Sequence, residues 1–215
     1  MKIIVTAGPT REPIDPVRFI SNRASGKMGY ALARSALKHG HEVVLISGPV
    51  SIEAPEHAKL IRVISGKEML DAVRKYLGWC NVLIMAAAVV DCRPEHISSH
   101  KIKKSQMPPS LDLKPVPDIL KTLSALKGDR IFVGFAAETE NIVESARQKL
   151  IDKGLDLIVA NNVEKTDSGF EVDTNRVTLI SSSTSTEALP LMLKDDIAEQ
   201  LIKWIENFSR NSSRK

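Results

Sequence analysis

The chain has 215 residues, of which 43% are hydrophobic, 26% are charged and 4% are aromatic. This composition excludes disordered, collagen-like and coiled-coil proteins, and the length suits one sizeable hydrophobic core, so we expect a single domain. The net charge of +4 and the pI near 9.0 permit nucleic-acid binding. The basic residues form no stripe interleaved with aromatic residues, however, so no nucleic-acid partner is predicted.

Hydropathy and cysteine content bear on whether the protein spans a membrane, is secreted, or is held together by disulfides or zinc. The apolar run Val82–Val90 is too short to cross a bilayer, and no separate signal-like segment precedes the first strand. We therefore predict no membrane partner and a cytoplasmic location. Cys80 and Cys92 lack the spacing of metal ligands, and they suggest neither a disulfide framework nor a zinc site.

Strand and helix patterns alternate along the chain. Near-continuous apolar runs predict buried strands at 3–7, 43–46, 82–88, 131–135 and 155–159. Amphipathic spacing predicts helices at 26–38, from Ser65 onward, at 140–153 and at 195–208, and a hairpin at 176–181 and 188–191. The alternation predicts a Rossmann-like, three-layer α/β fold with a mostly parallel sheet, helices on both faces and a C-terminal hairpin. The domain is expected to span 1–208, with a flexible tail at 209–215.

The connection between the first strand and the first helix, residues 8–29, is far longer than an ordinary βα loop. In an open parallel sheet, ligands bind beyond the carboxyl ends of the strands, where this loop begins. The loop also carries cationic and amide side chains, namely Arg11, Arg18, Asn22, Arg23 and Lys27. We therefore predict that it contributes to a binding site.

Small and polar residues follow the other predicted strands. Ala86–Ala88 would let a flat base or ribose lie against the backbone, and Asp91 could accept a hydrogen bond from a hydroxyl or an amine. Alternatively, the alanines only permit close packing and Asp91 caps a turn. Lys149 and Lys153 lie one helical turn apart, which suits a polyanion such as a nucleoside triphosphate or, alternatively, a solvated helix face.

Residues 91–110 show no helical or strand period and are rich in Pro, Ser, His and Lys, which suggests a mobile lid. A lid that closes over a site would exclude water and would bring Lys101 against developing negative charge. The alternative is a solvent-exposed loop whose lysines have no special role.

Several blocks of sequence are weak signals alone but specific when they occur together and in order. They lie at 5–22, 25–29, 87–91, 101–104, 117–119, 134–139 and 155–161. Through these blocks the chain, from Ile3 to about Asn175, resembles phosphopantothenate-cysteine ligases of the bacterial type.

The resemblance implies a ligase of coenzyme A biosynthesis that joins 4'-phosphopantothenate to L-cysteine at the expense of CTP. The carboxylate attacks the α-phosphate and pyrophosphate leaves, and the cysteine amine then displaces CMP from the acyl-cytidylate. Such a site needs no enzymic nucleophile, but it must align two anions and stabilise charge on oxygen. Mg²⁺ is expected on the triphosphate oxygens rather than in a cage of protein side chains, and no flavin is expected.

The resemblance also assigns roles to single residues. Asn22 would hold the reacting carboxylate or acyl intermediate, with Ala88 beside it in the substrate site. Arg18 resembles a substrate-binding arginine that reaches the neighbouring subunit, which implies a homodimer with shared active sites. Lys101 resembles the lid lysine that contacts nucleotide phosphates and supports amine attack. The positions that resemble nucleotide contacts are Ala86, Ala87, Asp91, Lys101, Pro117, Asp118, Ile119, Leu120, Phe135, Lys149 and Lys153.

The sequence departs from the family pattern at Ala24, Val90, Cys92 and Val116, and the last departure could alter contacts to the base or ribose. Bacterial relatives often carry a flavin-dependent decarboxylase as a first half, which this sequence lacks; a separately encoded decarboxylase and a cut domain both remain open. The choice between CTP and ATP also remains open.

Two other functions compete with the ligase. A dinucleotide-dependent redox domain is disfavoured because the loop at Gly8 lacks the Gly-x-Gly-x-x-Gly spacing. A nucleotide sensor without turnover would keep Asp91 and Lys149 but lose Asn22 or Lys101, and all four are present.

Overall fold

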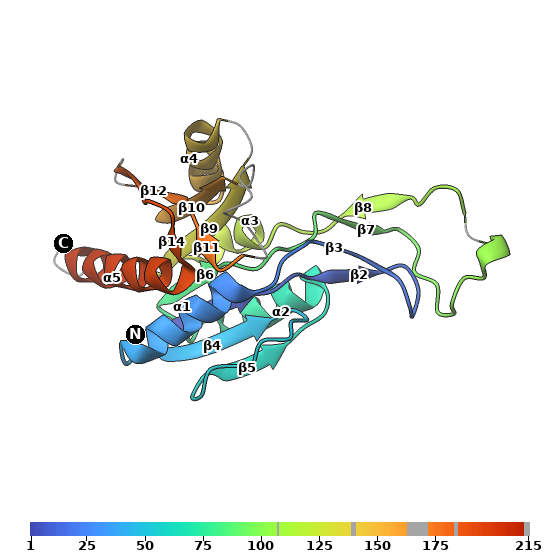
Figure 1. The fold of residues 1–215 in the computed structure, drawn as a ribbon, viewed down its shortest axis with the longest axis horizontal. Coiled ribbons are helices and arrows are strands. Elements are labelled where there is room, and N and C mark those ends of the chain that lie inside the picture. The colour runs from blue at the N-terminus through green and yellow to red at the C-terminus, as the bar shows by residue number, and fades with distance from the viewer. Residues whose placement is uncertain (107, 139–140, 163–171, 183–184, 213–215) are drawn as a thin grey trace.

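The computed structural model describes residues 1–106, 108–138, 141–162, 172–182 and 185–212. It consists of a layered body around a central sheet and a long arm that projects from one end of that body (Figure 1). In the part of the chain that is described, no helix is long and apolar enough to span a membrane.

The central sheet has eight strands in the order β13-β12-β10-β9-β6-β1-β4-β5. The strands from β10 to β5 run parallel, whereas β12 pairs antiparallel with β10 and β13 pairs antiparallel with β12. Their bounds are β1 Lys2–Ala7, β4 Glu42–Ser47, β5 Lys59–Arg62, β6 Val82–Met85, β9 Ile131–Glu138, β10 Leu157–Asn162, β12 Val177–Ser181 and β13 Thr186–Ala188. The order reverses at β1, because the chain first adds strands on one side of β1 and then crosses to β6 on the other.

Helices cover both faces of the sheet. Those of one face are α1 Lys27–Lys38 and α5 Lys194–Ser212. Those of the other are α2 Gly66–Leu77, α3 Ile119–Leu123 and α4 Ile142–Asp152. The 3-10 turn η2 Ser124–Leu126 follows α3, and the short strands β11 Thr174–Asn175 and β14 Met192–Leu193 pair beside α5.

The alternation of side chains along β1 explains why its sequence is apolar throughout. Ile3 and Val5 pack in the core on the α1 and α5 side, whereas Ile4 packs in the core on the α2 side. A central parallel strand is buried on both faces and therefore reads as a continuous hydrophobic run. Gly29 brings α1 very close to this strand, since a Cβ at that position would lie 2.5 Å from the Cβ of Ala7.

The arm is formed by two segments that are far apart in the sequence. The first is a hairpin of β2 Arg11–Pro13 and β3 Phe19–Ser21, and the second is a ladder of β7 Cys92–Pro94 and β8 Leu113–Pro115 with η1 Lys104–Gln106 beyond it. The segments lie side by side over much of their length (Figure 1). The long first loop and the segment predicted to be a lid therefore build one structural unit.

The predicted Rossmann-like fold, its three layers and its mostly parallel sheet are confirmed. Some boundaries were wrong. The third predicted strand ends at Met85 rather than at Ala88, and α5 runs to Ser212, so residues 209–212 belong to a helix rather than to the predicted tail. Residues 213–215 lie outside the described residues. The prediction also missed β5, α3 and the arm strands, which are short and carry weak periodic signals.

Candidate functional site

A cavity of about 440 Å³ lies beyond the carboxyl ends of β1, β6, β9 and β10. Its walls include Gly8 after β1 and Ala86 after β6, the neighbouring strands between which the sheet order reverses. This is the position at which open α/β sheets bind ligands. Most of the residues predicted to contact nucleotide or substrate line this one cavity, namely Asn22, Ala86, Ala87, Ala88, Asp91, Pro117, Asp118, Ile119, Leu120, Phe135, Lys149 and Lys153.

The loops that follow β1 and β6 are held together by backbone hydrogen bonds. The N–H of Ala88 donates to the carbonyl of Gly8 over 2.9 Å, and the N–H of Thr10 donates to the carbonyl of Ala88 over 3.2 Å. The Thr10 hydroxyl also accepts a bond from the N–H of Val90. These bonds fix the alanine segment as one wall of the cavity.

Asn22 is attached to the same wall. Its side-chain nitrogen donates to the carbonyls of Ala88 and Val89, each over 3.2 Å. The residue is exposed and lines the cavity, so its amide group is held in place while it remains accessible to a ligand. The structure thus brings Asn22 and Ala88, two of the three residues predicted at the substrate position, into direct contact.

The start of α1 forms another part of the wall. Gly26 has φ 84°, a left-handed conformation that favours glycine, and as the N-cap residue it offers no capping side chain; the N–H of Lys27 donates to the hydroxyl of Ser25 over 3.4 Å. The residues from Ser25 to Gly29 line the cavity. Backbone N–H groups at an uncapped helix start attract anions, so this wall suits a phosphate or a carboxylate.

One corner of the cavity is formed by α3 and α4. Asp118 caps α3, accepting a hydrogen bond from the N–H of Lys121, and its carboxylate lies 2.8 Å from the Nζ atom of Lys153. Burial opposes ionisation of Asp118, but the bonds from Lys153 and Lys121 outweigh it and hold the pKa of this carboxyl below its ordinary value. Lys149 lines the cavity one turn earlier on α4.

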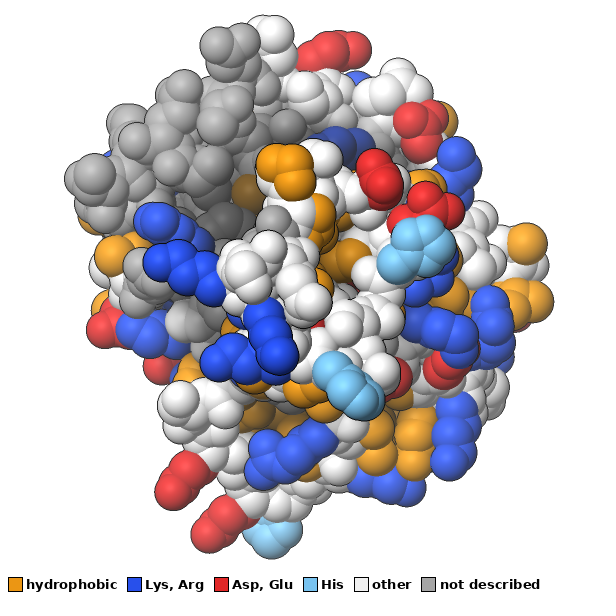
Figure 2. All heavy atoms as spheres, turned by 90° about the vertical axis from the view of Figure 1, so that its right-hand side faces the viewer, with side chains coloured by type: hydrophobic (Ala, Val, Ile, Leu, Met, Phe, Trp, Pro, Cys, Tyr) orange, Lys and Arg blue, Asp and Glu red, His pale blue; other side chains and the backbone are white. Residues whose placement is uncertain are grey.

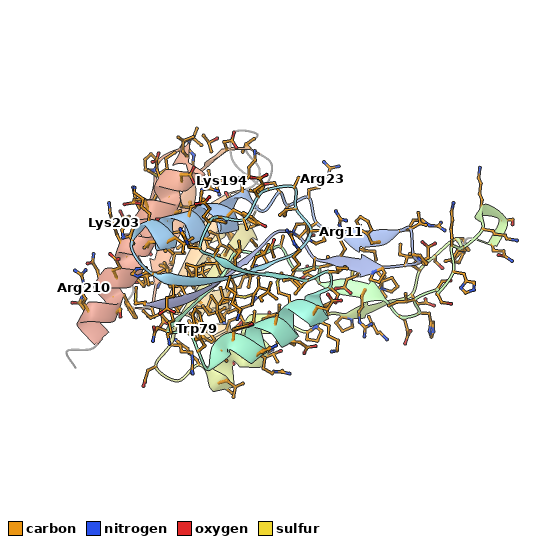
Figure 3. All side chains as sticks on the ribbon, turned by 90° about the horizontal axis from the view of Figure 1, so that it is seen from below. Arg11, Arg23, Trp79, Lys194, Lys203 and Arg210 are labelled. Carbon is orange, nitrogen blue, oxygen red and sulfur yellow. The ribbon has the colours of Figure 1, made fainter. Side chains whose placement is uncertain are left out.

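The other basic corner combines the first residues of α1 and α5. The Nζ atom of Lys27 lies 2.7 Å from a carboxylate oxygen of Asp173, while the Nζ atom of Lys194 donates to the carbonyl of Val172. Figure 3 shows Lys194 at the start of α5. Lys194 is only 6% exposed, and burial together with the charge of Lys27 lowers its pKa to about 8. The cavity therefore has cationic groups at both ends.

Between the two basic corners the cavity is lined by apolar side chains. The half-buried residues Ala86, Ala87 and Phe135 line this part, with Asp91 exposed at the rim. A cavity with an apolar middle and cationic ends matches a planar base joined to anionic groups. Among the described residues, no three His, Cys, Asp or Glu side chains are grouped so that they could hold a metal ion.

Two predicted catalytic residues lie elsewhere. Neither Arg18 nor Lys101 is among the described residues that line the cavity, and both belong to the arm. Arg18 forms a salt bridge with Asp15 at 2.6 Å and donates to the carbonyl of Ile102, the residue that follows Lys101. Within one chain, the structure therefore brings Arg18 and the Lys101 segment to each other but not to Asn22.

The site also contains residues to which the sequence analysis assigned no role, although Asn161 follows a predicted strand at the expected binding edge. Lys194 begins the last helix, and no motif near it suggested a ligand-binding role. Asn161 and Asn175 line the cavity and are buried, and the Oδ1 atom of Asn161 has no hydrogen-bond partner among the described residues. Asn161 directly follows the apolar run of β10, so its position at a strand end was the one available signal.

Comparison with known proteins shows which family the sequence of this chain matches. The model of the DNA/pantothenate metabolism flavoprotein C-terminal domain matches residues 1–208. The chain is 44% identical over 214 residues to the coenzyme A biosynthesis bifunctional protein CoaBC of Bacillus subtilis (strain 168), covering 99% of this chain and 53% of that protein. It is 45% identical over 206 residues to CoaBC of Escherichia coli (strain K12), covering 94% of this chain and 50% of that protein. The chain thus spans about half the length of these curated relatives.

A solved structure shares the fold. The crystal structure of the C-terminal domain of the coenzyme A biosynthesis bifunctional protein CoaBC matches with a TM-score of 0.84 and 40% sequence identity, covering 98% of this chain and 96% of that chain. The similarity thus extends over nearly the whole of both chains.

Proposed function

We propose, from the premise that this chain belongs to the family of the DNA/pantothenate metabolism flavoprotein C-terminal domain, that it is a CTP-dependent phosphopantothenate-cysteine ligase. It joins 4'-phosphopantothenate and L-cysteine through an acyl-cytidylate, releasing pyrophosphate and CMP. The observation that carries the proposal is a single cavity that combines Asn22 with two basic corners on either side of an apolar wall.

The cavity suits a reaction between two anions. The planar base lies against Ala86, Ala87 and Phe135, while the basic corners balance the charges of the phosphates. Asn22 contacts the reacting carboxylate and gives up a backbone carbonyl contact to do so. Positioning and fixed donors of this kind accelerate such reactions by about a hundredfold or more per well-placed group.

Mg²⁺ would be bound by triphosphate oxygens and water, and when bound it would neutralise charge on the phosphates. The protein contributes the shape of the cavity and the fixed cations at its two ends.

The arm supports a homodimer with shared active sites. It exposes large apolar side chains, including Val17 at 59%, Ile97 at 50% and Leu113 at 50%. Exposed apolar groups that cluster on one projecting element favour contact with another protein surface. A second copy of the chain places its arm across the cavity and so supplies Arg18 and Lys101, the two residues that each chain lacks at its own cavity.

The reaction can be tested with purified protein. Pyrophosphate release from CTP is expected only when 4'-phosphopantothenate is present, and the amide product is expected only after L-cysteine is added. Pyrophosphate release without the acid, or equal turnover with unrelated acids, would contradict the proposal. A parallel measurement with ATP, GTP and UTP checks the base preference.

A further inference from the structure

The turn of the β2–β3 hairpin is organised by one buried carboxylate. The side chain of Asp15 is 0% exposed, and its Oδ1 atom accepts hydrogen bonds from the N–H groups of Val17 and Arg18, each over 2.8 Å. The Oδ2 atom accepts bonds from Nε and Nη2 of Arg18 over 3.0 and 2.6 Å. An aspartate that bonds to the backbone two and three residues later is a standard way to close a tight turn.

The same carboxylate also binds the lid segment. Its Oδ2 atom accepts a hydrogen bond from the N–H of Ile102 over 3.2 Å, and Nη2 of Arg18 donates to the carbonyl of Ile102 over 2.7 Å. The N–H of Ser98 donates to the carbonyl of Ile14 over 3.0 Å. The chain is therefore attached to the hairpin turn on both sides of Lys101.

The carboxylate remains ionised in this arrangement. Burial alone would raise the pKa of Asp15, but the bonds from the backbone of Val17, Arg18 and Ile102 and from the Arg18 guanidinium hold it far below its ordinary value. A buried charge that is fully hydrogen-bonded and paired stabilises one geometry of its neighbours, and removing it takes away the carboxylate that pairs with the Arg18 guanidinium.

From these contacts we propose that Asp15 is a positioning residue that joins Arg18 and Lys101 into one unit, which the arm delivers together to the cavity of the partner subunit. The inference rests on the proposed ligase function and extends it.

The segment predicted to be a lid is then not an independent flap, because it moves together with the β2–β3 hairpin. Figure 2 views the molecule from the end at which the arm projects and shows Lys and Arg side chains on this face, beside hydrophobic ones.

Mixed dimers test whether the two residues act from the same arm. Each chain of the dimer would carry one substitution and its own affinity tag. The mixed dimers would be purified through both tags in turn, and their ligase turnover would be measured. Arg18→Ala paired with Asn22→Ala, and Lys101→Ala paired with Asn22→Ala, should each leave one complete site of the two, giving about half of wild-type turnover in a symmetric dimer. Arg18→Ala paired with Lys101→Ala should stay inactive, because every site then receives a damaged arm.

Recovery in the last pair would overturn the inference, since it would mean that Arg18 and Lys101 reach a site from different chains. Failure of the first two pairs to recover would also overturn it, since the arm would then not act on the partner's cavity. Lys104→Ala paired with Asn22→Ala is the matched control, and it should behave as the wild-type chain paired with Asn22→Ala.

The role of Asp15 is tested with Asp15→Asn, which keeps the size of the side chain. Turnover should fall at least tenfold. In mixed dimers this variant should regain activity with Asn22→Ala but not with Arg18→Ala. A chain that was merely destabilised would not recover activity with one partner variant and fail to recover it with the other. Asp112→Asn, an exposed acid on the same arm, is the control and should retain turnover.

Equal recovery of Asp15→Asn with both partners, or full activity of Asp15→Asn alone, would contradict the positioning role. The outcome is separable from that of the proposed function. Turnover of the wild-type chain tests the ligase assignment, whereas the pattern among the mixed dimers tests how the arm is built.

Discussion

The body and the arm of this molecule hold their functional residues by different physical means. In the body, Ala88 lies just beyond the buried strand β6 and Lys194 begins α5, so the core that forms the fold also places them. In the arm, few side chains are buried, and a hydrogen-bonded carboxylate at Asp15 sets the geometry. Backbone topology thus determines the cavity, whereas a small polar network determines what the arm presents. The two regions should therefore respond differently to substitution.

The largest effect is expected from a substitution at the cavity of the body, and it is an effect on turnover. Asn22→Ala should lower kcat by about a hundredfold or more while changing CTP affinity little, because its proposed contact is to the reacting acyl group. Single-turnover kinetics and CTP titration measure the two quantities. Equal losses in both would indicate that Asn22 supports the cavity wall rather than the reaction.

A substitution of a tightly packed glycine should lower the stability of the body and leave the structure of the arm unchanged. Gly29→Ala places a Cβ 2.5 Å from Ala7 and 2.8 Å from the Thr6 carbonyl, so α1 must move away from β1. We expect a loss of about 1–3 kcal/mol of unfolding free energy, measured by denaturant titration. Gly78→Ala is the control, since its Cβ would meet nothing within 4 Å. Unchanged stability in Gly29→Ala would show that the contact between helix and strand is not tight.

The basic corner at α5 should contribute to nucleotide affinity in a pH-dependent way. Lys194 is charged below its pKa of about 8 and neutral above it, so attraction to phosphate falls as the pH rises through that value. Lys194→Met should weaken CTP binding about tenfold at pH 7 and should flatten this pH dependence, as calorimetry can measure. Lys203→Met, at an exposed position on the same helix, should leave CTP binding unchanged. An identical pH profile in wild type and Lys194→Met would assign the titration to another group.

The smallest effect concerns the packing of α5 on α1, away from both cavity and arm. His39 lies 2.9 Å from a carboxylate oxygen of Glu199 and 3.1 Å from one of Glu206. These contacts raise the pKa of His39 above its ordinary value of 6.5, and the bond to Glu199 contributes most. Its stabilising contribution is complete below pH 6.5 and is lost as the pH rises through the higher value of the folded state. His39→Gln should thus lower Tm by a few degrees at pH 6 and by less at pH 9.

Thermal melts across this pH range check the prediction. His96→Gln, at an exposed position of the arm, is the control and should leave Tm nearly unchanged. A constant difference between wild type and His39→Gln would mean that His39 does not titrate within this range.

The sequence by itself determined the layered body, because buried parallel strands require apolar runs and amphipathic helices require a hydrophobic stripe. Those local rules also predicted that Ala86–Ala88 and the loop that carries Asn22 lie at the binding edge of the sheet, although the strand itself ends at Met85. The short strands of the arm were missed, since three residues are too few to show a period.

Only the tertiary structure decided which distant residues meet. It joined the first loop to the predicted lid through Asp15, and it brought Lys194 from the last helix to a cavity whose other walls come from earlier in the chain. It also separated Lys101 from Asn22 within one chain. The reason is physical: composition and period report what each segment buries, whereas contacts between side chains far apart in sequence depend on how the segments pack against one another.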